Sequence, residues 1–395
     1  MRLGTANTFD NTLANLSQRQ ADLADLQEKL SAGKRVVRPS DDPVGAAQAE
    51  RAQNRLSRIE TDQRALKLQV NAMSMVESTL GDSVLAMQNI RDLVINAGNG
   101  AYNSQDRQSL ALQMQGLRDQ LFNYANRLDS NGNPLFGGLA SQAAPFVDAA
   151  SGVSFSGIGG QRAATTTAIP GAMDGQTVWM NVPSGNGVFQ VNLNPGNTGA
   201  VNTDAGQVID PTLVTGHSYS IAFTSPSTYS VSDTSINPPA VVINNQTYTS
   251  GQAIVFDGLS IVVQGKAQSG DSLQVSPSTQ LNVFKVIDDA IASIRGDSGN
   301  ILSHKLSLAL TQIDASTNRL ESARMVAGDL LNRADTIDSN QQSKTLQLEA
   351  DRSRAEDLDM PQAISEFQSQ QTGYDSALKT YAAVQRLSLF NYISG

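Results

Sequence analysis

Proline is distributed so unevenly along this chain that its positions alone limit where long helices can form. Of the 13 prolines, nine lie between positions 141 and 280, none lies from Val44 to Asn133, and none lies from Ser278 to Met360. Proline inside a helix removes a backbone hydrogen bond and clashes with the preceding turn. The two long proline-free stretches, which are rich in good helix formers, therefore suit long helices, whereas the proline-rich middle does not.

The first proline-free stretch carries apolar residues at alternating steps of three and four, the spacing of one seam of a coiled coil. It predicts a helix of about 50 residues, longer than an ordinary globular helix. Asp41-Asp42-Pro43 marks its start, because aspartate accepts from free backbone amides and proline suits the first helical position. A second helix is expected from about Ser104 to Leu128, and residues 281–349 should supply the returning partner. The seam positions are Leu56, Ile59, Gln63, Leu66, Val70, Met73, Glu77, Leu80, Val84, Met87, Arg91 and Val94.

Between Ser141 and Gln280 the chain changes character. This block holds only 9 charged residues in 140 and is dense in glycine, serine, threonine, asparagine and proline. Short apolar runs such as Tyr219–Phe223 and Leu259–Val263 are separated by turn residues, which is typical of an all-β domain. The single tryptophan, Trp179, is expected to anchor the core of this domain.

The two ends of the chain carry similar thin apolar stripes on otherwise polar sequences. Such helices are marginal alone, because so narrow a stripe cannot bury itself against its own core. We therefore expect the two ends to come together and to need further partners. The stripes consist of Leu13, Leu16, Leu23 and Leu30 at the N-terminal end and of Ile364, Phe367, Tyr374, Leu378 and Tyr381 at the C-terminal end.

These patterns together predict an α+β fold. Its main part is an elongated, coiled-coil-like helical bundle built from the N- and C-terminal segments, with an all-β domain inserted at the centre. The predicted divisions are terminal helices at 1–42 and 350–395, a helical bundle at 43–140 and 281–349, and a β-rich insertion at 141–280.

Composition argues against several classes of function. With 28 basic and 37 acidic residues the net charge is −9, whereas nucleic-acid binding calls for clustered basic residues in excess. The chain has no cysteine and two histidines, His217 and His304, so thiolate metal sites are excluded and few groups can serve as a general base. No apolar run fits a cleaved signal peptide or a membrane span. We expect no membrane contact.

The motifs that suggest chemistry are incomplete. Asp129-Ser130-Asn131-Gly132-Asn133 resembles the start of a calcium loop, but the sixth position is Pro134 rather than glycine and the twelfth is Ala140 rather than glutamate. A turn is the better interpretation. Paired carboxylates lie at helix ends or on polar faces, where capping explains them. We therefore expect no catalytic residues, no metal and no cofactor.

The only concentration of basic residues extends into the start of the long helix and consists of Lys29, Lys34, Arg35, Arg38, Arg51, Arg55 and Arg58. Arg51, Arg55 and Arg58 share one helical face. They form either a solvated face or a contact with acidic neighbouring subunits, through intersubunit salt bridges. Nucleic acid is a weaker alternative, because no aromatic residues are interleaved with them.

Several runs resemble the flagellins and hook-associated proteins of bacterial flagella. An N-terminal signature extends from Leu30–Val36 (LSAGKRV) through Pro39–Ala47 (PSDDPVGAA) to Arg51. Asp129–Gly138 (DSNGNPLFGG) is similar to the turn after the second helix of that family, and the C-terminal run through Leu387–Ile393 (LSLFNYI) is similar to its end. The resemblance covers roughly residues 1–140 and 281–395. The middle block resembles no known domain and corresponds to the variable, surface-facing part of the family.

The resemblance implies an extracellular structural subunit, not an enzyme, that acts as an adaptor between hook and filament and is needed for motility. Such subunits leave the cell unfolded through the flagellar export channel, without a cleaved signal peptide. The implied partners are further copies in a ring, hook-associated protein 1, flagellin and an export chaperone that binds the C-terminal helix. The assembly contacts would be the two terminal stripes together with Leu389 and Phe390.

Two alternatives remain open from the residues. The first is a flagellin, which would form the filament itself. The second is a hydrolase or binding module within the β-rich block, suggested by its isolation and its polar composition.

Overall fold

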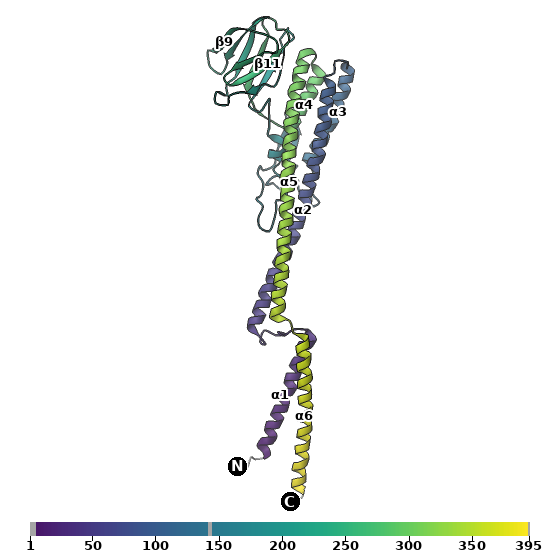
Figure 1. Cartoon of the computed structure of the whole chain (residues 1–395). Helices are drawn as coiled ribbons and strands as arrows, with labels where there is room; N and C mark the ends of the chain where they lie inside the picture. The colour runs from purple at the N-terminus through teal and green to yellow at the C-terminus, as the bar shows by residue number, and fades with distance from the viewer. Residues whose placement is uncertain (1–4, 141–143, 394–395) are drawn as a thin grey trace. The chain divides into compact units, whose positions relative to one another are not determined.

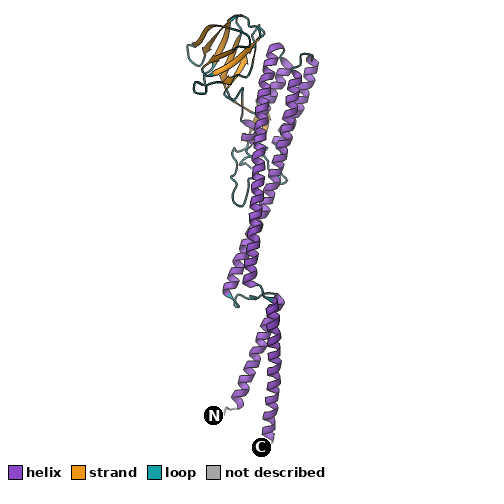
Figure 2. Ribbon diagram, in the orientation of Figure 1, coloured by secondary structure: helices purple, strands orange, loops and turns teal. Residues whose placement is uncertain are grey.

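The structure, a computed structural model, describes residues 5–140 and 144–393 (Figures 1 and 2). Long helices flank a central region of strands, which confirms the predicted fold class. The helices are α1 (Thr5–Ala32), α2 (Pro43–Ala97), α3 (Ser104–Ala125), α4 (Val283–Gly296), α5 (Gly299–Glu356) and α6 (Met360–Ile393), with a π-helix, η1, at Gln176–Met180. The strands are β1 (Phe146–Ala149), β2 (Gly152–Phe155), β3 (Val182–Pro183), β4 (Phe189–Leu193), β5 (Asn202–Thr203), β6 (Gln207–Val208), β7 (Tyr219–Ser225), β8 (Thr228–Asp233), β9 (Ala240–Thr247), β10 (Ala253–Phe256), β11 (Leu259–Gln264), β12 (Ser272–Pro277) and β13 (Gln280–Leu281).

The chain divides into two compact units. The end unit comprises Met1–Arg64 and Ile337–Gly395, and the central unit comprises Ala65–Thr336. The end unit contains α1, α6 and parts of α2 and α5. The central unit contains the remainder of α2 and α5, the helices α3 and α4, and all of the strands.

The predicted seam of α2 forms the apolar core of the helical part of the central unit. Met73, Leu80, Met87 and Val94 have no exposed surface. The two polar positions in this part of the seam are used for ion pairs with the antiparallel helix α5. Nε of Arg324 lies 2.7 Å from the Glu77 carboxylate, and Nε of Arg91 lies 2.7 Å from that of Asp314. The seven-residue pattern is therefore continuous, with cross-helix charge pairs at the polar positions. Its buried members are Leu66, Met73, Leu80, Val84, Met87 and Val94.

Trp179 lies in η1 and packs against the helices, so the expectation that it anchors the β core is wrong. Its ring stacks on Phe284 of α4 at 5.8 Å and meets the edge of Phe136 at 5.6 Å. All three side chains are fully buried. The side chains of Phe136 and Trp179 thus belong to the helical core, although Trp179 lies in a segment with the composition of the β-rich block.

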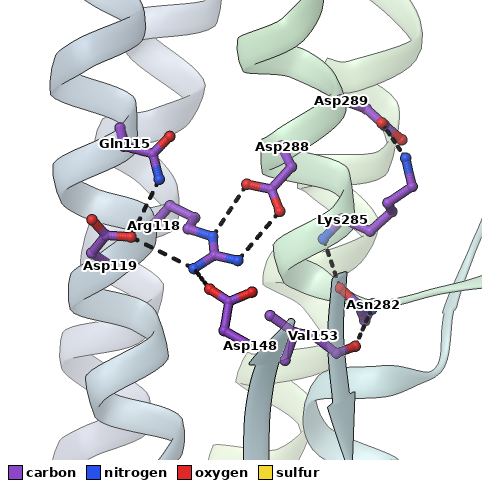
Figure 3. A network of polar contacts seen from close by, with 9 residues as sticks. All are labelled: Gln115, Arg118, Asp119, Asp148, Val153, Asn282, Lys285, Asp288 and Asp289. Carbon is purple, nitrogen blue, oxygen red and sulfur yellow. Dashed lines mark hydrogen bonds and ion pairs between the residues drawn. The ribbon is translucent and has the colours of Figure 1, made fainter. Parts of the chain in front are cut away.

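Beside these rings, Arg118 of α3 holds three elements together (Figure 3). Its guanidinium pairs with Asp148 of β1 and, at 3.1 Å, with Asp288 of α4, and its Cζ lies 5.7 Å from the centre of the Phe284 ring. Only 7% of the side chain is exposed. Burial alone would lower the pKa of Arg118, but the hydrogen bonds to both carboxylates outweigh it and raise the pKa overall.

The strands between β4 and β12 form a separate core. A five-stranded antiparallel sheet has the order β4-β12-β7-β8-β9, and a smaller sheet has the order β10-β11-β5, with β6 also pairing with β11. Alternate residues of each sheet point into one shared core. Rings of Tyr219 and Phe256, one from each sheet, approach to 4.9 Å. The expectation of an all-β domain in this block is confirmed for these strands.

The β core contacts the helical part of the central unit through His304 of α5. Nε2 of the His304 ring donates a hydrogen bond to the backbone carbonyl of Val191 in β4, at 3.0 Å. The side chain is 4% exposed. Burial lowers the pKa of His304, because the low-dielectric surroundings disfavour the charged ring.

Replacing Arg118 by methionine should lower the free energy of unfolding by about 2 kcal/mol, since it removes a buried cation and leaves two partly exposed carboxylates without their partner. The matched control is Arg324→Met, because Arg324 is 49% exposed and its pair with Glu77 is solvent-screened. That change should cost less than about 1 kcal/mol. Urea unfolding monitored by Trp179 fluorescence measures both values. Equal losses in the two variants would contradict the special role given to Arg118.

The lowered pKa of His304 predicts how stability depends on pH. As pH falls below the ordinary value of 6.5, the unfolded chain binds a proton that the folded chain resists, so stability should decline. The decline attributable to His304 is at most about 1.4 kcal/mol per pH unit. His304→Gln keeps a donor for Val191 but removes the titration, so its curve should be flatter. Urea unfolding of both proteins between pH 7.5 and 5.5, by fluorescence and circular dichroism, isolates the difference. Parallel curves would refute this assignment.

Candidate assembly interface

The two chain ends pair with each other in the end unit. Helices α1 and α6, purple and yellow in Figure 1, lie side by side. Just before α2, the segments that link these helices to α2 and α5 are also joined. The Arg35 amide donates to the Glu356 carbonyl at 2.7 Å, and the Leu358 amide donates to the Gly33 carbonyl at 3.1 Å. Gly33 has a φ of +66°, the left-handed conformation that ends α1.

Arg35 binds the ends of two helices at this point. Its Nη1 donates to Asp42 at 3.0 Å, and its Nη2 donates to the Ala355 carbonyl in the last turn of α5 at 2.8 Å. Asp42 accepts from the amides of Val44 and Gly45, so it caps α2 as the sequence predicts. The Gly45 amide and the Arg35 guanidinium hold the pKa of the Asp42 carboxyl below its usual range. A cation at a helix C-terminus and an anion at a helix N-terminus are thereby linked.

The terminal stripes are only partly covered by this pairing. Leu13 is 50% exposed, Ile364 is 45% exposed and Leu378 is 40% exposed. In the parts of α1 and α6 whose side chains the structure describes, residues 10–32 and 360–383, Ala363 alone is buried. Leu389 and Phe390 lie in α6 beyond these described side chains. The remaining members of the predicted interface are half-buried, namely Leu16, Leu23, Leu30, Phe367, Tyr374 and Tyr381.

The basic residues near the start of α2 fall into two groups. Four cations have carboxylate partners within the end unit: Lys29 with Asp25, Lys34 with Glu356, Arg35 with Asp42 and Arg38 with Glu28. Arg51, Arg55 and Arg58 are exposed, and within the described residues none of them forms an ion pair. The sequence did not distinguish the two groups, because only Lys29 has its partner within its own helix, and the partners of Lys34, Arg35 and Arg38 depend on the fold around the end of α1.

Chemical groups elsewhere do not assemble a reactive site among the described residues. Asp129 accepts hydrogen bonds from the amides of Asn131 and Asn133, which makes a turn of the segment that resembles a calcium loop. His217 Nδ1 lies 2.6 Å from the Asp233 carboxylate, a pairing missed in the sequence, but no described hydroxyl is hydrogen-bonded to that ring. No cluster of three metal-ligating side chains occurs in the part of the chain that was described. Among the described helices, none is long and apolar enough to cross a membrane.

Comparison with known proteins finds similar proteins in bacterial flagella. Residues 5–141 match the model of the bacterial flagellin N-terminal helical region. Flagellar hook-associated protein 3 of Salmonella typhimurium is 26% identical over 406 aligned positions, which cover 99% of each chain. The crystal structure of flagellar hook-associated protein 3 from Legionella pneumophila superimposes with a TM-score of 0.71 at 28% identity, covering 76% of this chain and 97% of that one.

These comparisons support the resemblance to the flagellins and hook-associated proteins. Similarity to flagellins is more distant: Bacillus subtilis flagellin is 29% identical over 32% of this chain and 43% of its own length, and a Clostridium tyrobutyricum flagellin is 22% identical over 91% of this chain. The stronger similarity to hook-associated protein 3 favours a structural protein of the hook–filament junction over a filament subunit. Its relatives are structural proteins of the flagellum.

The middle block is not without relatives, contrary to the sequence-based expectation. Residues 192–277 match the model of the flagellar hook-associated protein 1 D2-like domain. This range coincides with the β core, from the end of β4 to β12. No short motif in the block signals the match, because a small β domain is specified by alternation and turns rather than by a fixed run of residues.

Two leucine substitutions should show that, in the monomer, a core position of the central unit contributes more to stability than a stripe position of the end unit. Leu80→Ala, at a position with no exposed surface, should lower the free energy of unfolding by about 3 kcal/mol. Leu23→Ala, at a half-buried position of α1, should cost less than about 1 kcal/mol. Thermal unfolding by circular dichroism measures both. A loss in Leu23→Ala as large as in Leu80→Ala would show that α1 already has a complete core.

Proposed function

We propose that this protein forms a ring of subunits between the hook and the filament, held together by α1 and α6. The observation that carries the proposal is that these helices pair in one copy yet leave their apolar stripes open. Burying a leucine side chain fully contributes about 1.5–3 kcal/mol relative to leaving it exposed. The nine members of the two stripes whose side chains are described are half-buried or exposed, so burying them further against neighbouring copies would contribute additional free energy.

The energetics favour assembly over a folded terminal domain. Ordering a residue costs about 1–2 kcal/mol of conformational entropy, which thin amphipathic helices barely recover alone. Copies that pack around a channel would cover the stripes from both sides. The three-part division expected from the sequence fits this scheme, with 1–42 and 350–395 at the inner wall and the β-rich block at the outside.

The partners follow from the adaptor role. The ring would contact hook-associated protein 1 on the hook side and flagellin on the filament side, and the flagellin-type N-terminal region supports a matching geometry. Before assembly, an export chaperone would cover the C-terminal stripe. We infer that the chain reaches the cell exterior unfolded, through the flagellar export channel, and that it performs no catalysis.

Deleting the gene tests the proposal directly. Cells should keep hooks but lack filaments and release flagellin monomers into the medium, because the filament then has no base to grow from. The native gene should restore filaments seen by electron microscopy. Filaments that persist in the deletion strain would contradict the adaptor role.

Complementation also tests the interface. A gene carrying Leu23→Asp and Ile364→Asp should be secreted but should fail to restore filaments. The control Leu112→Asp changes a leucine of α3 that is 66% exposed, outside the stripes, and should complement fully. Filaments in cells carrying the double variant would remove the terminal stripes from the interface.

A further inference from the structure

A groove whose charged lining residues are mainly cations runs along α2 and α5 within the end unit. Two hollows of about 320 and 340 Å³ adjoin each other, since both are lined by Arg55, Leu348 and Asp351. Its floor is partly apolar, with Ala52 and Ile59. We call this surface the basic groove. Its charged lining residues are Arg51, Arg55, Arg58, Lys344, Arg354 and Asp351.

The cations of the basic groove are mostly uncompensated. Asp351 pairs with Arg354. The other four, Arg51, Arg55, Arg58 and Lys344, are exposed, and no described carboxylate lies within ion-pair distance of them. Arg51, Arg55 and Arg58 follow one another at helical spacings of four and three, where like charges destabilise a helix. An isolated copy thus carries a repulsion that an added anion would relieve.

A second groove in the same unit has the opposite character. It lies along α1 and α6, has a volume of about 490 Å³ and is floored by Leu26, Leu358 and Ala363. We call it the acidic groove. Its charged lining residues are Asp22, Asp25, Lys29, Arg35, Asp359 and Glu366.

The two cations of the acidic groove already have partners. Lys29 pairs with Asp25, and Arg35 pairs with Asp42. Among the described residues, Asp22 accepts from the Gln18 amide group and Asp359 accepts from the Gln362 backbone amide. Glu366 is exposed and forms no ion pair with a described residue. Three carboxylates are therefore available to a cation from another molecule.

We propose that neighbouring copies of this chain dock by placing the basic groove of one copy against the acidic groove of the next. The inference rests on the proposed function, because it presumes that copies assemble. Charge complementarity identifies the occupant: the uncompensated cations of one surface match the uncompensated carboxylates of the other, and both floors are apolar. Nucleic acid does not fit, since the chain is negative overall and no aromatic side chain lines the basic groove.

The geometry of this contact has a consequence for the assembly. Because the two grooves are different surfaces, the contact is head to tail, and repeated contacts of this kind generate a ring or a helix rather than a closed dimer. Charged contacts contribute more to orientation and rate of association than to affinity. The grooves set the alignment of neighbours, and the terminal stripes supply the affinity.

Disulfide cross-linking can detect the contact, because the chain has no cysteine of its own. In flagella isolated from complemented cells, a chain carrying Lys344→Cys and Glu366→Cys should form a ladder of covalent oligomers on oxidation. The control chain carries Leu112→Cys with Glu366→Cys and should stay monomeric on a denaturing gel. A ladder in the control alone, or in neither chain, would overturn the proposal.

Charge reversal provides a second measurement. Arg51→Glu with Arg55→Glu, or Asp22→Lys with Glu366→Lys, should reduce the number of filaments per cell by about tenfold, since like charges then face each other. The chain with all four changes restores opposite charges across each contact and should recover most filaments. Normal filament numbers in both double variants would refute the grooves while leaving the adaptor role intact. Filaments in the gene deletion would instead refute the adaptor role itself.

Discussion

The incomplete burial of the terminal helices is the constraint on which the rest of the molecule depends. In the central unit, the seam of α2 is closed by its own chain, and Met73, Leu80 and Met87 have no exposed surface. In the end unit the corresponding apolar edge of α1 and α6 stays open, with Leu13 50% exposed. Apolar burial is the main favourable term in folding. Among the described side chains, one copy therefore completes the core of its central unit but leaves the apolar edges of α1 and α6 partly exposed.

Much of this could be predicted from sequence because the signals are local and repeated. The steps of three and four that mark the α2 seam depend only on helix geometry, and Asp42 caps α2 through amides two and three residues away. The partners of the polar seam positions could not be predicted. Glu77 meets a residue 247 positions along the chain, and Arg91 meets one 223 positions along. Which charged residue of α5 faces which charged residue of α2 depends on the register of the two antiparallel helices. The local sequence pattern of neither helix specifies that register.

The errors have the same origin. Trp179 lies in a segment with the composition of the β-rich block, yet its ring stacks on Phe284 in the helical core. Composition reports the local backbone preference of a segment, not the core into which its side chains point. The basic residues illustrate this for the candidate interface. Lys29 to Arg58 form one cluster in sequence, but the cations up to Arg38 have carboxylate partners, one local and three set by the fold. Arg51, Arg55 and Arg58 have no ion-pair partner among the described residues.

The end unit has two kinds of surface, apolar stripes and charged groups, and each would have a different role in an assembly. Burial of an apolar stripe is strong but non-directional, so helices with a seven-residue repeat can slide by one repeat and lose little contact. Charged groups at fixed positions penalise such shifts, because a displaced cation meets another cation or no partner. Arg51, Arg55 and Arg58 repel one another in the isolated helix. In the proposed assembly, the same charges would define the alignment between copies. On this view the stripes of α1 and α6 determine whether subunits associate, and the charges around them determine how.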